Sequence, residues 1–168
     1  GGVDVTDGAG NLTTCPIEFC MALASATPVN DAGGFNAQNS LDVLNPGETP
    51  YLGNPSFSVL VDDAADACSI TPGSLVLVVM GFAPGSLIVD GLGCGPATPG
   101  DVLLSFGAQQ IFLQPTLIWS GPGTSSAVFS MPIPLRTDIC GAAAYLQAAW
   151  IDLAGPAGPA VLTNRLDL

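Results

Sequence analysis

The sequence predicts an all-β protein, an antiparallel β-sandwich of an immunoglobulin-like or jelly-roll-like kind. Its 168 residues include 21 Gly and 15 Pro, and 48% of the residues are hydrophobic. The apolar residues fall in short runs between clusters of Gly and Pro, which is typical of strands separated by turns. The intervals between these runs are too short for the helical crossovers of a parallel sheet, so we expect antiparallel pairing.

The first fifty residues are predicted to form an irregular, cysteine-containing extension, and residues 51–168 the sandwich domain. Residues 1–11 and 27–39 are rich in Gly, Asp and Asn, and an apolar run over residues 12–26 lies between them. One short strand followed by turn residues is expected over residues 40–55. The extension is therefore the candidate segment for assembly or strand donation.

Eight further strands are expected from residue 55 onward, each bounded by turn signals rich in Gly and Pro. They cover residues 57–61, 74–82, 86–89, 101–106, 110–119, 126–131, 143–151 and 160–168.

The composition of one run also favours a helix, because residues 142–154 are rich in Ala, Leu and Gln. Gly141 and Gly155 bracket the run, and its side chains alternate with a period of two. We therefore prefer a strand here and keep a helix as the alternative.

Five cysteines in a chain with so few charged residues predict an oxidising compartment, where disulfides persist. Along an up-and-down path two strands separate Cys68 from Cys94, which places both at the same end of the sheet and makes them the preferred pair. Cys140 is expected at the opposite end. Cys15 and Cys20 either close a small loop together, or one of them reaches Cys140. Because the number of cysteines is odd, at least one thiol stays free or bonds to another chain.

The stretch from residue 55 to the end carries a recurring set of motifs. They are a Pro-Ile-Pro turn at 132–134, a Tyr-x-Gln strand with Tyr145 and Gln147, then Asp152, and a terminal Thr-Asn-x-Leu strand at 163–166. This stretch resembles a C-terminal module of many large secreted bacterial proteins. The resemblance implies an all-β fold and secretion, and it assigns no catalytic role to any residue. The chain departs from the pattern in its cysteine-containing first fifty residues and at Arg165, where a small residue is usual.

The charge balance excludes several classes of function. Arg136 and Arg165 are the only cationic side chains against fourteen acids, and the net charge is -12. A nucleic acid or an anionic membrane surface would need a cluster of cations that the chain lacks. With no His and no Lys, imidazole ligands, Schiff-base amines and Ser-His pairs are absent. No apolar run is long enough to span a bilayer. We therefore expect no enzyme, no catalytic residue, no cofactor and no membrane span.

Acidic clusters are the candidate metal ligands. Asp62, Asp63 and Asp66 lie within five residues, and three carboxylates could bind Ca²⁺. A solvated acidic loop is the preferred interpretation, because the spacing matches no calcium-binding loop. The same holds for Asp4, Asp7 and Asn11. We expect no metal site.

Two features are candidates for carbohydrate. Asn11 begins an Asn-Leu-Thr triplet that fits the N-glycosylation acceptor. Tyr145, Gln147 and Trp150 share one predicted strand and are the candidate ligand face. Packing in the core or at sheet edges is the preferred role of the aromatic residues Tyr51, Trp119, Tyr145 and Trp150.

The function expected from these features is a non-catalytic, extracellular structural or interaction module. Mean hydropathy is +0.52, so a sandwich with so few charges exposes apolar patches and sheet edges, and such surfaces usually contact another protein. The expected partners are other copies of the chain or other extracellular proteins, in an assembly such as a filament in which the N-terminal segment donates a strand. The alternative is a carbohydrate-binding or adhesion module accessory to a larger secreted protein. Because the sequence does not begin with Met, we expect a processed or excised product.

Overall fold

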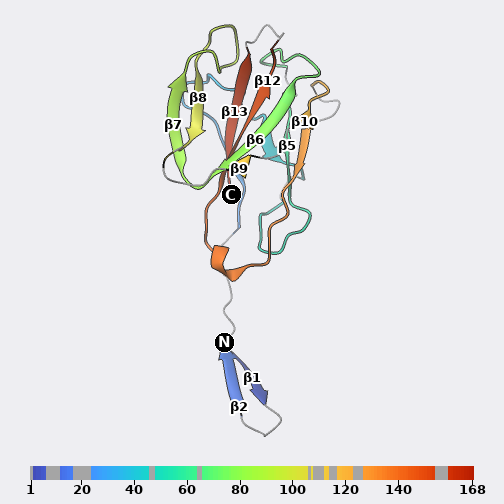
Figure 1. Ribbon diagram of the computed structural model, residues 1–168, viewed down its shortest axis with the longest axis vertical. Coiled ribbons are helices and arrows are strands. Elements are labelled where there is room, and N and C mark those ends of the chain that lie inside the picture. Colours follow the sequence, from blue (N-terminus) through green and yellow to red (C-terminus); the bar gives the residue numbers. More distant parts are fainter. Residues whose placement is uncertain are drawn as a thin grey trace.

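The chain forms antiparallel sheets in a computed structural model that describes residues 2–6, 12–16, 24–45, 48–63, 66–105, 107, 112–113, 117–122, 127–153 and 159–168 (Figure 1). The strands are β1 (Gly2–Thr6), β2 (Leu12–Pro16), β3 (Thr27–Val29), β4 (Leu41–Val43), β5 (Ser58–Val61), β6 (Leu75–Gly81), β7 (Pro84–Val89), β8 (Gly100–Leu104), β9 (Phe112–Leu113), β10 (Leu117–Ile118), β11 (Ala127–Ser130), β12 (Tyr145–Ile151) and β13 (Ala160–Asp167), and the one helical turn in these ranges is η1 (Thr137–Ile139).

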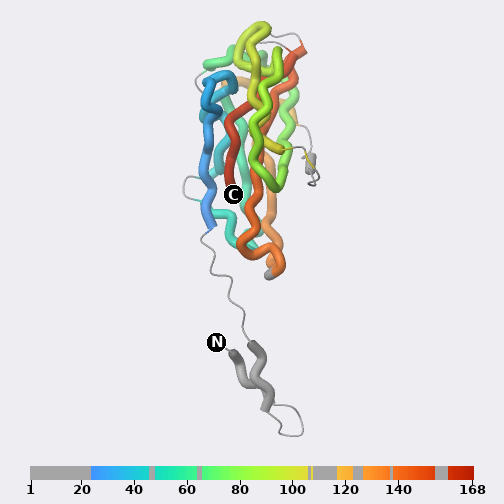
Figure 2. Tube along the Cα trace, turned by 90° about the vertical axis from the view of Figure 1, so that its left-hand side faces the viewer, coloured from blue at the N-terminus to red at the C-terminus, as the bar shows by residue number. Residues whose placement is uncertain are grey.

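Two of the sheets pack face to face as in a β-sandwich, which confirms the predicted all-β class. The larger sheet has the order β10-β6-β12-β13-β3, with β9 also paired to β6, and the smaller has the order β11-β5-β4. All ladders between these strands are antiparallel. In the side view the strands run along the long axis, with the loop after β7 at one end and η1 at the other (Figure 2).

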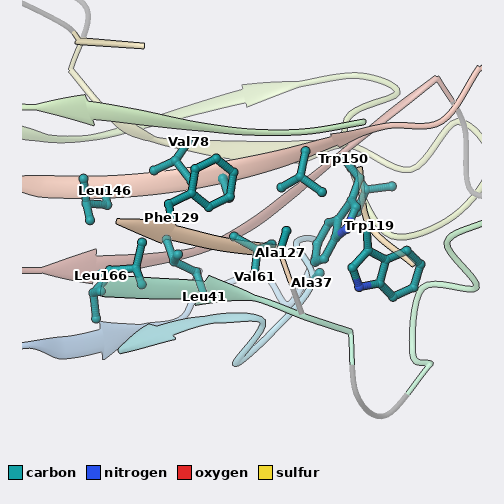
Figure 3. Packing of buried hydrophobic residues seen from close by; sticks show 14 of the residues in the cluster. Ala37, Leu41, Val61, Val78, Trp119, Ala127, Phe129, Leu146, Trp150 and Leu166 are labelled. Carbon is teal, nitrogen blue, oxygen red and sulfur yellow. The ribbon is translucent and has the colours of Figure 1, made fainter. Parts of the chain in front are cut away.

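The core lies between these two sheets and follows from the two-residue period of each strand. Val76 and Val78 of β6 are buried against the smaller sheet, and so are Leu146, Ala148 and Trp150 of β12 (Figure 3). Side chains at i and i+2 share one face of a strand, so the residues between them point to the other face of the larger sheet.

The β7–β8 hairpin packs on that other face. Val102 and Leu104 of β8 line a small cavity together with Val79, Ala149 and Leu162 of the larger sheet. All of β8 is buried, whereas most of β7 is exposed. The hairpin thus adds a third layer, with β8 inside and β7 outside.

The N-terminal part differs from its expected irregular structure. β1 and β2 form their own two-stranded antiparallel sheet, and β3 and β4 belong to the two packed sheets. The sandwich therefore includes strands from Thr27 onward, and residues before position 50 contribute to it.

From residue 57 the expected strands are present, with one change. The run over residues 110–119, expected as one strand, contains the two short strands β9 and β10, both paired with β6. Residues 145–151 form β12, so the strand interpretation of this Ala-rich run is confirmed over the helix. None of the described residues belongs to a helix with the length and hydropathy needed to cross a bilayer.

Candidate functional site

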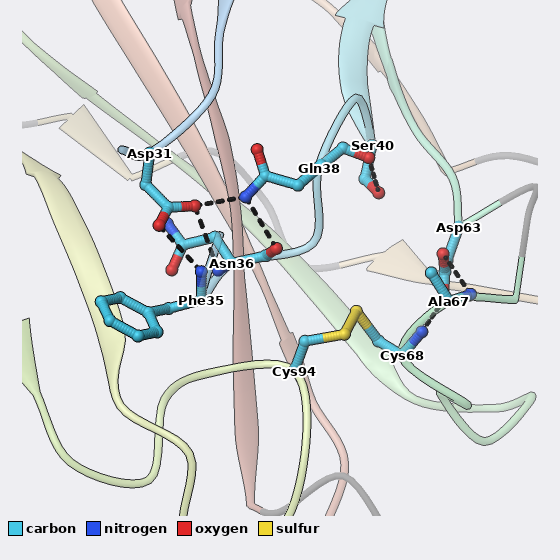
Figure 4. The surroundings of a disulfide bond; sticks show 9 residues. All are labelled: Asp31, Phe35, Asn36, Gln38, Ser40, Asp63, Ala67, Cys68 and Cys94. Atoms are coloured by element: carbon cyan, nitrogen blue, oxygen red, sulfur yellow. Dashed lines mark hydrogen bonds between the residues drawn. A yellow bond between two sulfur atoms is a disulfide. The ribbon is translucent and has the colours of Figure 1, made fainter. Parts of the chain in front are cut away.

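The predicted disulfide between Cys68 and Cys94 is present (Figure 4). The two Cα atoms are 4.9 Å apart, within the range that a disulfide requires. Cys68 lies in the loop after β5 and Cys94 in the loop after β7, so the bond joins the smaller sheet to the third layer. Cys94 is also held by its backbone N–H, which donates to the carbonyl of Phe35 at 2.8 Å.

Cys140 lies at the opposite end of the sandwich, directly after η1, as the strand count predicted. It is also disulfide-bonded. Cys15 lies in β2, opposite Val3 in the register, and Cys20 lies outside the described residues.

The acidic residues after β5 act as structural acceptors. The Asp63 carboxylate accepts the backbone N–H groups of Ala67 at 3.1 Å and Cys68 at 2.9 Å, and Asp62 Oδ1 accepts the indole Nε1–H of Trp119 at 3.2 Å. Asp62 and Asp63 are both buried, so the solvated acidic loop is wrong for these two side chains. Among the described residues no three His, Cys, Asp or Glu side chains are grouped as metal ligands. Asp4 lies in β1, and Asp7 and Asn11 fall outside the described residues.

Two buried side-chain amides connect β8 to the larger sheet. The Gln147 side chain donates from Nε2 to the carbonyls of Asp101 at 2.9 Å and Thr163 at 3.0 Å, and its Oε1 accepts the Leu103 N–H at 2.9 Å. The Asn36 side chain donates from Nδ2 to the same two carbonyls at 2.7 and 3.0 Å, and its Oδ1 accepts the Asp101 N–H at 2.8 Å. Every polar atom of both amides is therefore used within the fold.

The terminal Asn of the Thr-Asn-x-Leu motif has a similar role. Asn164 Oδ1 accepts the N–H groups of Ser40 and Leu41, both at 2.8 Å, and its Nδ2 donates to the Leu41 carbonyl at 2.9 Å. Asn164 thus connects the segment entering β4 to β13. Two of the motif residues, Gln147 and Asn164, therefore connect separate layers of the fold.

The charged side chains of Asp152 and Arg165 also form contacts within the fold. Asp152 Oδ2 accepts the Thr71 N–H at 2.8 Å. The Arg165 guanidinium lies 5.3 Å from the centre of the Tyr145 ring and donates from Nε to Asp167 Oδ1 at 2.5 Å. Arg165 is therefore held between an aromatic face and a carboxylate, which are the contacts expected of a guanidinium.

The structure does not assemble the candidate ligand face. Trp150 is 0% exposed and Gln147 is 3% exposed, and only Tyr145 is partly exposed. Trp150 packs edge-on against Trp119, with ring centres 5.9 Å apart, so both indoles belong to the core. The preferred core role is therefore correct for the two tryptophans, and neither Gln147 nor Trp150 can contact a ligand at the surface.

Several large apolar side chains are exposed at the surface of the described residues. Leu87 and Ile88 of β7 are 58% and 50% exposed, and β7 pairs with β8 alone among the described strands, so its outer edge has no strand neighbour there. Other exposed large apolar side chains are Leu44, Tyr51, Leu75, Phe82, Ile118, Val128, Leu135 and Leu153.

An apolar groove of about 760 Å³ opens at the end of the sandwich that carries η1. We call it the end groove. Its lining includes Tyr51, Phe82, Met131, Cys140 and Leu168. The exposed pair Arg136 and Asp138 lies on the same connection as η1, with an ion-pair distance of 2.5 Å.

Comparisons with protein-family models, with curated protein sequences and with solved structures gave no match for this chain. The function is therefore argued from the residues and their geometry.

Proposed function

We propose that the protein is a non-catalytic extracellular interaction module, secreted as the resemblance of its C-terminal two-thirds implies, that assembles with other copies of itself through sheet edges. The observation that carries the proposal is the outer edge of β7. It combines two half-exposed apolar side chains, Leu87 and Ile88, with a backbone edge that has no strand neighbour in the described part of the chain. Such an edge is a template for another strand.

The N-terminal hairpin is the proposed donor. β1 and β2 pair with each other in a separate sheet, so each has an outer edge without a strand neighbour in the described part of the chain. Strand addition from one copy to β7 of the next is head-to-tail, and a head-to-tail contact that does not close into a ring generates a filament.

The hydrogen bonds that buried polar side chains form with the backbone support a non-catalytic module. Asn36, Asp63, Asp101 and Gln147 are buried and accept backbone N–H groups or donate to backbone carbonyls. The Cys68–Cys94 disulfide is compatible with an oxidising, extracellular compartment.

The experiment is to compare the native chain with Leu87→Asp and Ile88→Asp. We expect the native chain to sediment as oligomers whose size rises with concentration, and each variant to sediment as a monomer. Leu153→Asp is the control, because Leu153 is 85% exposed and lies outside the strands. A native chain that remains a monomer at all concentrations and forms no filaments in electron micrographs contradicts the proposal.

A carbohydrate-binding or adhesion module is the second candidate, supported by Tyr51, an aromatic side chain 53% exposed at the end groove. Retention of the native chain on insoluble glycans, and its loss in Tyr51→Ala, would favour this function over self-assembly.

A further inference from the structure

The cavity between the third layer and the larger sheet has a volume of about 200 Å³. We call it the interlayer cavity. Apart from Gln147, every described residue of its lining is apolar. The Gln147 amide is already bonded to backbone groups of Asp101, Leu103 and Thr163. Because a water molecule in a cavity needs two to four polar partners, this lining suits an apolar molecule better than water.

Polar links at two points of the lining hold the layers apart. The Gln147 side chain bonds the Asp101 carbonyl and the Leu103 N–H of β8, both at 2.9 Å. The Leu162 N–H in β13 donates to the carbonyl of Leu92, in the loop after β7, at 3.0 Å. Gln147, Leu92 and Leu162 all line the cavity. Closing the cavity would break these bonds, so the space is part of the folded structure.

The sheet is irregular where it borders the cavity. The register between β12 and β13 shifts between Gln147 and Ala149, and the Ala148 N–H donates to the Thr163 hydroxyl at 2.9 Å. β-Bulges redirect side chains and are frequent next to functional sites. The floor of the cavity at this bulge includes the small side chain of Ala149, which leaves the space open.

The lining extends from the surface into the interior. Leu92 and Leu162 are partly exposed, whereas Val102 and Leu104 of β8 are buried. A small molecule therefore reaches the cavity from solvent along the partly exposed residues.

We propose that the interlayer cavity is a binding site for a small, uncharged apolar molecule about the size of benzene. A dry apolar cavity of about 150 Å³ accommodates benzene, and the interlayer cavity is larger. The net charge of -12 opposes an anionic ligand, and the apolar lining opposes a strongly polar one. This binding does not depend on contacts between copies, so it goes beyond the proposed function.

The first test uses benzene as the probe and the native chain. We expect the melting temperature to rise with benzene concentration, by about 3 °C at ten times the dissociation constant. We also expect nuclear Overhauser effects between the benzene protons and the methyl groups of Val102 and Leu162. No rise in melting temperature, or Overhauser effects only to residues outside the cavity, overturns the proposal.

The second test fills the cavity. Ala149→Leu adds apolar volume to the lining, and we expect it to weaken benzene binding at least about tenfold. Ala143→Leu is the matched control, because Ala143 is exposed and lines the end groove, and we expect it to bind benzene as the native chain does. Loss of binding in Ala143→Leu but not in Ala149→Leu would place benzene in the end groove and overturn the proposal.

The Overhauser effects in the native chain decide the question even if Ala149→Leu does not fold. Sedimentation of the same samples reports self-assembly separately, so this proposal and the proposed function fail independently.

Discussion

The side-chain amides of Asn36 and Gln147 donate to the same two backbone carbonyls, those of Asp101 in β8 and Thr163 in β13. Each amide also accepts a backbone N–H from β8, from Asp101 or Leu103. Each side-chain amide both donates a hydrogen bond to β8 and accepts one from it. It therefore pairs with β8 in the way that a backbone peptide group of a neighbouring strand would. β8 is thereby joined to the larger sheet although no backbone ladder connects β8 to β13 among the described residues.

Replacing Gln147 should therefore be costly. Gln147→Leu keeps much of the side-chain volume but leaves the buried Leu103 N–H without an acceptor, and it removes one donor from each of the two shared carbonyls. We expect a loss of about 2–4 kcal/mol in the free energy of unfolding, measured by urea denaturation. Asn45→Ala is the control, because Asn45 is an exposed amide that bonds Glu48, and we expect a change below about 0.5 kcal/mol. Equal stability of the native chain and Gln147→Leu would refute this role.

The two core tryptophans should respond differently to replacement by Phe. Trp119 Nε1 donates to the buried Asp62, whereas Trp150 Nε1 is buried with no hydrogen-bond partner among the described residues. Both substitutions reduce packing, but Trp119→Phe also removes a hydrogen bond to a carboxylate, which contributes about 1.5–3 kcal/mol. We expect Trp119→Phe to be the less stable variant by at least about 1 kcal/mol in parallel thermal and urea unfolding. The reverse order would show that the Asp62 contact is not stabilising.

The Cys68–Cys94 disulfide should stabilise the sandwich mainly by restricting the unfolded chain. It links residues 26 apart in sequence, and a loop of this size corresponds to about 3 kcal/mol. We expect the double variant Cys68→Ala/Cys94→Ala to lose about that amount. Because Cys140 is also disulfide-bonded, chemical reduction affects more than one bond, and the double variant isolates this one. An unchanged denaturation midpoint would contradict the expectation.

The exposed Arg136–Asp138 pair predicts a local pH dependence. The hydrogen bond from Arg136 holds the pKa of Asp138 below its usual value of 3.8. A lowered pKa in the folded state means that the pair stabilises the fold above pH 3.8 and loses this effect as the pH falls through the lowered pKa. We expect Arg136→Gln to return the pKa of Asp138 toward 3.8 in an NMR titration of the carboxyl carbon. Because both side chains are fully exposed, the effect on global stability should be small.

The strands from residue 57 onward could be predicted because their signals are local: apolar runs with Gly or Pro at both ends. β3 gave no such signal, since it has three residues, one of them Pro28, and lies at the edge of its sheet. The Cys68–Cys94 pair could be predicted because strand count alone decides which end of the sheet a loop occupies.

The roles of the polar residues could not be predicted in the same way. Gln147 was recognised within a motif, but its partners Asp101 and Thr163 lie 46 and 16 residues away, and only the packing of three layers brings them together. Asp62 and Asp63 looked like solvated acids because a cluster of charges is usually solvated. Their burial depends on Trp119 and on the turn at Ala67, which no local pattern reveals.

The Cys68–Cys94 bond has a mechanical consequence. A chain pulled by its two ends carries tension across the bond, so the segment from Cys68 to Cys94, which includes β6 and β7, remains a closed ring even after the hydrogen bonds around it have broken. About 90 Å of contour length is thereby withheld from extension. In the proposed assembly, that ring would limit how far one stretched copy lengthens before its neighbours share the force.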